Sequence, residues 1–168
     1  MENTKPYAKF LQRAKSLGAK HAKIIPARSI VTAQWVRLKC QFGCGTYGTR
    51  LTCPPNSPTP EQTQKLVECY KNALMIHGDE YTDIHEVISA LEREMFLDGY
   101  YKAFGMAAGP CGLCKRCPKT CAYPEKARPA MEACGIDVFA TARANGFPIE
   151  VVRTENCKGN YYGVVLIE

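Results

Sequence analysis

The residues best suited to chemistry in this chain are four cysteines within eleven residues, Cys111, Cys114, Cys117 and Cys121. Their spacing, C-x2-C-x2-C-x3-C, is that of bacterial ferredoxins, in which the fourth cysteine ligates a different cluster from the first three. Sulfurs at i, i+3 and i+6 can each bind a separate corner of a cubane, whereas a single zinc ion usually takes two cysteine pairs from two separate turns. The spacing therefore favours a [4Fe-4S] cluster, with zinc as the alternative metal.

Three further cysteines, Cys40, Cys44 and Cys53, lie in a segment rich in glycine and proline. Small residues let backbone amides approach the sulfurs of a cluster and donate hydrogen bonds that tune its potential. The pattern therefore predicts two cysteine-rich metal loops, at about 40–55 and about 109–124.

The remaining cysteines differ in their surroundings. Cys134 precedes a helix start and is the candidate for an eighth ligand, whereas Cys69 is predicted to be a small core residue on a helix face and Cys157 an exposed thiol in a turn.

One or two clusters are compatible with these eight candidate ligands. With two, we expect one cubane on Cys111, Cys114, Cys117 and Cys134, and the other on Cys40, Cys44, Cys53 and Cys121. Proline follows Cys117 rather than Cys121, which departs from the ferredoxin pattern, so the sharing of Cys121 is a hypothesis.

The overall composition bears on compartment and partners. The first twenty residues contain no apolar run and no cleavage site, so we expect a cytoplasmic protein whose reduced cysteines serve as ligands or redox groups. No apolar stretch is long enough to cross a membrane. Of the net charge of +6, the first fifty residues contribute ten Lys and Arg against one Glu. This basic region would suit an acidic partner or offset an anionic cluster, but it lacks the interleaved aromatics that would indicate nucleic-acid binding.

Predicted helices and strands alternate along the chain, and they must position these cysteines. Apolar spacing and capping residues predict helices at 5–17, 60–70, 81–101 and 138–145, and strands at 22–27, 73–77, 102–108, 149–153 and 161–167. The segment 31–40 is ambiguous between helix and strand. We therefore expect an α/β or α+β fold, a single compact domain over 1–168 in which helices and a four- to five-stranded sheet form a sandwich.

The stretches CQFGCGTYGTRLTCPP and CGLCKRCPKTCAYPEKARPAMEACGIDVFATARANG resemble the predicted metal-binding proteins of domain-of-unknown-function family 2284, and the resemblance covers roughly residues 5–167. It implies iron–sulfur clusters and an anaerobic archaeal or bacterial lineage, but no known reaction. It also includes the segment from Arg128 to Gly135, which adds weight to Cys134 as a ligand.

Two functions of different classes follow. One is single-electron transfer by one or two [4Fe-4S] clusters to a redox partner protein. The other is an enzyme in which a cluster with only three protein ligands binds a small substrate at its open iron. A structural zinc protein is a third reading. Eight ligating cysteines would favour electron transfer, whereas seven would leave one iron free.

Overall fold

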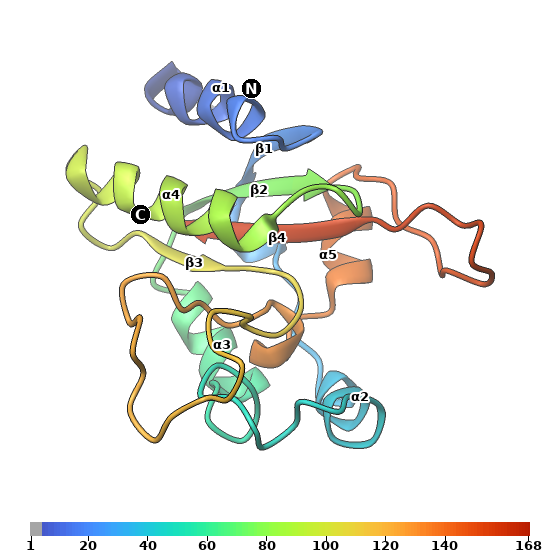
Figure 1. The fold of residues 1–168 in the computed structure, drawn as a ribbon. Helices are drawn as coiled ribbons and strands as arrows, with labels where there is room; N and C mark the ends of the chain where they lie inside the picture. The colour runs from blue at the N-terminus through green and yellow to red at the C-terminus, as the bar shows by residue number, and fades with distance from the viewer. Residues whose placement is uncertain (1–4) are drawn as a thin grey trace.

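A four-stranded antiparallel sheet forms the centre of the molecule in the computed structural model, which describes residues 5–168. The strands follow the order β1-β2-β4-β3 (Figure 1). Their bounds are β1 His21–Pro26, β2 Asn72–Gly78, β3 Phe104–Met106 and β4 Tyr161–Leu166. The fold is therefore α+β, and the predicted sandwich of helices and sheet is confirmed.

Both faces of this sheet are buried, because the apolar strands project alternate side chains to opposite sides. Leu74 of β2 pairs with Val165 of β4 on one face, and the next pair, Met75 with Val164, lies on the other. A separate set of helices and loops must therefore pack on each face.

Two helices cover the first face, α1 (Ala8–Ser16) and α4 (Ile84–Leu97) (Figure 1). The side chain of Asp83 caps α4 by accepting a hydrogen bond from the Glu86 amide at 3.0 Å. The helix buries residues at helical spacing, Ile84, Val87, Ile88, Leu91 and Met95. The long predicted helix is confirmed, with shorter ends.

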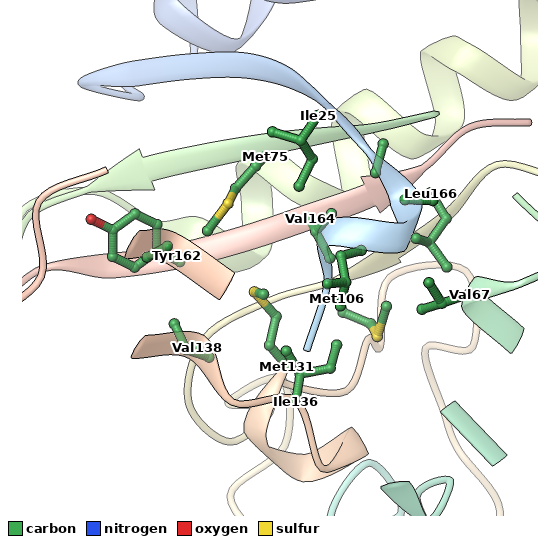
Figure 2. Close-up of a cluster of buried hydrophobic side chains, with 14 of the residues drawn as sticks. Ile25, Val67, Met75, Met106, Met131, Ile136, Val138, Tyr162, Val164 and Leu166 are labelled. Atoms are coloured by element: carbon green, nitrogen blue, oxygen red, sulfur yellow. The ribbon is translucent and has the colours of Figure 1, made fainter. Parts of the chain in front are cut away.

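On the opposite side lie α3 (Pro60–Val67), α5 (Val138–Ala144) and the long loops, and α2 (Trp35–Gly43) lies farther from the sheet, against the 3-10 turn Glu132–Cys134 (Figure 1). Figure 2 shows Met131 and Ile136 among the side chains packed with Met75 and Val164 of the sheet. The predicted capping box at Thr59 and Gln62 opens α3, and Asp137 caps α5 as expected. Short 3-10 turns lie at Lys5–Tyr7, Ala27–Ser29 and Glu132–Cys134.

Three sequence expectations are corrected. Residues 149–153 form no strand, and Val151 and Val152 are instead exposed in an irregular segment. Cys69 is exposed rather than in the core, because α3 ends at Val67 and the thiol, now in the following turn, donates to the Lys65 carbonyl oxygen at 3.4 Å. Cys40 lies on helix α2 rather than in an irregular loop.

Among residues 5–168, none of the helices combines the length and the apolar character that a membrane crossing requires.

Candidate metal centre

The first cysteine set begins on a helix. Cys40 occupies the last turns of α2, and Cys44 is the residue that caps its end. The backbone is extended at Cys44 (φ −127°, ψ 121°), and the two cysteines lie close enough for their charges to interact. The Cys40 thiol donates to the Glu132 carbonyl oxygen at 3.8 Å, and burial raises its pKa, helped by the neighbouring Cys44.

A hydroxyl group links the other two members of this set. Thr46 Oγ1 lies 3.1 Å from Cys44 Sγ and 3.8 Å from Cys53 Sγ. The hydrogen bond from Thr46 holds the pKa of the Cys44 thiol below its ordinary value, which favours the thiolate that metals bind. Cys53 is buried at 6% exposure, within a loop closed by a 2.8 Å bond from the Gly48 amide to the Pro54 carbonyl.

The four-cysteine motif surrounds a separate cavity, and Cys111, Cys114, Cys117 and Cys121 all lie on its wall. Arg50, Leu51 and Thr52 from the first cysteine loop complete that wall. The Arg50 guanidinium donates to the Cys114 carbonyl oxygen at 2.6 Å, and the Leu51 amide donates to Cys117 Sγ at 3.4 Å. The two cysteine loops are thus hydrogen-bonded to each other, and one of these bonds ends on a sulfur.

The base of the four-cysteine loop is fixed to the edge of the sheet. Ala107, just after β3, exchanges backbone hydrogen bonds with Pro129 and Met131, both at 2.8 Å, which closes the loop. Arg128 forms two hydrogen bonds with the carboxylate of Glu92 on α4, and Glu92 also accepts from the Gly105 amide of β3 at 2.7 Å. The side chains of Arg128 and Glu92 are only 14% and 12% exposed, so this ion pair is largely buried.

Cys134 lies in different surroundings from the other candidate ligands. Its side chain is 1% exposed and belongs to the apolar core below the sheet. Burial raises the pKa of its thiol to about 12. Its carbonyl accepts a hydrogen bond from the Thr63 hydroxyl at 2.6 Å, which ties it to α3.

Cys121 shares the wall of one cavity with Cys111, Cys114 and Cys117, whereas Cys134 lies close enough to Cys40 for their charges to interact. Both observations bear on how two clusters would divide the cysteines, and that division stays a prediction.

Cys40, Cys44 and Cys53 line a larger cavity of about 540 Å³. Glu132 also lines it, and its side chain is exposed. Nearby protein atoms reduce the hydration of its carboxyl group and so raise its pKa. Most of the other wall residues are apolar, from α2, α5 and the segment 149–162.

Sequence reasoning missed three polar contributors to these sites, namely Thr46, Glu132 and the amide of Leu51. Thr46 stands two residues after Cys44, and its position between two cysteines was the only available signal. Glu132 and the Leu51 amide make contacts between segments that are distant in the sequence, so no local sequence pattern predicts them.

The chemical types of these groups fit an iron–sulfur cluster: the thiols are ligands for iron, and an amide and a hydroxyl form hydrogen bonds with their sulfurs. Within the described chain, residues 5–168, no three His, Cys, Asp or Glu side chains are gathered closely enough to hold one metal ion.

Comparison with known protein families gives a match over most of the chain. The family model described as "Predicted metal-binding protein (DUF2284)" matches residues 23–167. Neither the curated proteins nor the solved structures include a match to this chain.

Proposed function

Because the chain belongs to DUF2284, a family of predicted metal-binding proteins, we propose that it is an iron–sulfur protein that passes single electrons to a partner protein. The observation that carries the proposal is the grouping of seven cysteines on the walls of two cavities whose loops are hydrogen-bonded together. Cysteine thiolates are the ligands that hold [4Fe-4S] clusters.

At the first site, Cys111, Cys114, Cys117 and Cys121 would supply four thiolates to one cubane. Such a cluster gives one-electron redox chemistry when bound. The Leu51 amide would then stabilise negative charge on Cys117, and Arg50 would hold the loop in place from the opposite side.

At the second site, Cys40, Cys44 and Cys53 would supply three thiolates to a second cubane. The fourth ligand is either Cys134, which must lose its proton inside the core, or a group that is not a cysteine. The large cavity beside these thiols favours a second candidate function, in which this site binds a small molecule at the corner that no protein thiolate occupies.

The excess of Lys and Arg in the first fifty residues supports an acidic redox partner, and the reducing cytoplasm is the compartment in which ten free thiols would persist. We propose that the whole chain acts there as one domain.

The metal content of protein purified without oxygen tests the proposal. We expect iron with acid-labile sulfide and a broad visible absorption that bleaches with dithionite. The variants Cys114→Ser and Cys44→Ser should each lose cluster, whereas Cys69→Ser, whose thiol is exposed outside both sites, should retain it. Stoichiometric zinc without sulfide would instead identify a structural zinc protein.

The assignment of the fourth ligands has its own test. If Cys121 belongs with the four-cysteine motif, Cys121→Ser should remove the same cluster as Cys114→Ser, and the double variant should lose no more iron than either single one. Cys134→Ser should affect only the cluster that Cys44→Ser affects. Loss of both clusters from Cys121→Ser alone would restore the ferredoxin-like sharing expected from the spacing.

A further inference from the structure

We infer that the cavity beside Cys40, Cys44 and Cys53 is a binding site for a small, uncharged molecule with a largely apolar body. Its volume of about 540 Å³ is in the range of ordinary ligand sites in proteins, about 300–1,000 Å³. The cavity thus has room for one molecule of that size beside the three thiols.

The walls of this cavity come from elements far apart in sequence. Trp35 projects from α2, and Val138 and Phe139 come from α5. Val152 comes from the segment that leads into β4, and Tyr161 is the first residue of β4. Because these side chains are aromatic or branched, they offer a contact surface for a hydrophobic group rather than for water.

Several of the same side chains are more exposed than apolar residues usually are. Trp35 is 47% exposed, Val152 is 56% exposed and Tyr161 is 44% exposed. A bound apolar molecule would remove part of this surface from water, and that burial would drive binding.

The charge on the walls argues for an uncharged ligand. The charged wall residues are Lys39, Glu132 and Glu150, which are mixed in sign. All three side chains are exposed, so they can remain hydrated. A charged ligand would lose hydration against the apolar walls and gain no matching cluster of opposite charge.

This inference rests on the proposed function only for what happens to the bound molecule, which would lie next to Cys40, Cys44 and Cys53. Binding itself depends on the apolar walls and not on metal. The two ideas can therefore fail separately.

The test uses three probes that share one apolar body: 4-phenylbutan-1-ol, 4-phenylbutylamine and 4-phenylbutyrate. Trp35 is the only tryptophan of the chain, so its fluorescence, excited where the probes do not absorb, reports on the cavity. Calorimetry measures the same affinities independently. With anaerobically purified protein we expect the alcohol to bind about tenfold or more tightly than either charged probe.

Two variants locate the site. Val152→Asp places a carboxylate on the exposed wall and should weaken binding of the alcohol about tenfold or more. Leu97→Asp, at a 70% exposed position at the end of α4, makes the equivalent change elsewhere and should leave binding unchanged. Val151→Asp repeats the test at a second wall position if Val152→Asp does not fold.

Protein of the parent sequence from which metal has been removed should still bind the alcohol in preference to the charged probes. If the purified protein binds the alcohol but contains no iron, the proposed function fails and this inference stands. Absence of binding to the alcohol, equal affinity for all three probes, or an unchanged affinity in both wall variants would overturn the inference. Self-association that Val152→Asp abolishes, without any binding of the alcohol, would overturn it in favour of an interface between two copies.

Discussion

The hydroxyl of Thr46 lies within reach of two sulfurs, those of Cys44 and Cys53. In an iron–sulfur site, hydrogen bonds to cysteine sulfur stabilise the more negative, reduced cluster and so raise its reduction potential. Thr46 is therefore expected to set the potential of the second site without holding its metal.

We predict that Thr46→Val retains iron but lowers the reduction potential. One hydrogen bond contributes about 0.5–1.5 kcal/mol, which for one electron corresponds to a shift of roughly 20–60 mV. The measurement is a redox titration followed by electron paramagnetic resonance. Thr49→Val is the matched control, since the Thr49 hydroxyl donates to a carbonyl oxygen rather than to sulfur. A potential equal to that of the parent would show that Thr46 serves only the loop.

Spacing within a short loop predicts that Cys111, Cys114 and Cys117 act together, and the structure places these three with Cys121 on the wall of one cavity. Arg50 contacts Cys114 and Leu51 contacts Cys117 across sixty and more positions of the chain, so no sequence pattern could predict these contacts. Which cysteines would hold the same cluster stays a prediction.

Among the elements, the turn after the 3-10 helix Glu132–Cys134 depends on a glycine. Gly135 has a φ of +76°, and a Cβ atom there would lie 2.4 Å from Cγ of Pro60 at the start of α3. This close approach holds Glu132 and Cys134 against α3, behind the second cysteine set.

We predict that Gly135→Ala destabilises the fold more than Gly146→Ala does. Gly146 has nearly the same φ, +77°, but a Cβ atom added there would have no neighbour within 4 Å, so it isolates the backbone cost of about 1–2 kcal/mol. The clash with Pro60 should add about 1–3 kcal/mol. Urea denaturation measures both variants, and equal losses would mean that the chain relaxes around Pro60.

The loop that carries the four-cysteine motif depends on the Arg128–Glu92 pair. We predict that Arg128→Ala costs about 3–5 kcal/mol of unfolding free energy, because it leaves the Glu92 carboxylate largely buried without its partner. The double variant Arg128→Met with Glu92→Gln should recover part of that loss. A double variant no more stable than Arg128→Ala would show that the packing of Arg128 over Phe104, and not its charge, supports the loop.

Four of the helices, α1, α3, α4 and α5, were predictable because they carry local signals, such as the capping box of α3 and the apolar face of α4. Helix α2 has no capping side chain at its start, and its sequence left helix and strand open. The segment 149–153 has the β-branched residues of a strand, but strand formation also requires a partner. In the structure Val151 and Val152 contribute to a cavity wall instead. Propensity alone cannot separate these outcomes.

At the scale of the whole molecule, a pair of stacked histidines joins β1 to β2. The Nδ1 atoms of His21 and His77 are 2.9 Å apart, and His77 Nε2 contacts Oδ1 of Asn160 at 2.8 Å. His77 is 7% exposed, and burial lowers its pKa below the usual value near 6.5. Its neutral form is therefore the one that the folded state favours.

We predict that the protein loses stability as the pH falls below about 6.5. Since the folded-state pKa of His77 is the lower one, the unfolded chain takes up its proton first, and the penalty grows until the pH passes the folded-state pKa. Above the unfolded-state pKa this effect is absent. Urea midpoints at pH 7.5, 6.5 and 5.5 measure it, and His77→Gln should flatten the decline. Parallel declines in both proteins would assign the effect to other groups.

The strand order has a consequence for biosynthesis. β4, the last strand of residues 5–168, lies between β2 and β3 in the sheet, and Tyr161 at its start also lines the cavity beside Cys40. During synthesis the sheet can therefore close only after β4 has left the ribosome. Until then this cavity lacks the wall that Tyr161 supplies, although Cys40, Cys44 and Cys53 are made much earlier. These three thiols therefore exist for a time in the nascent chain before their cavity is complete.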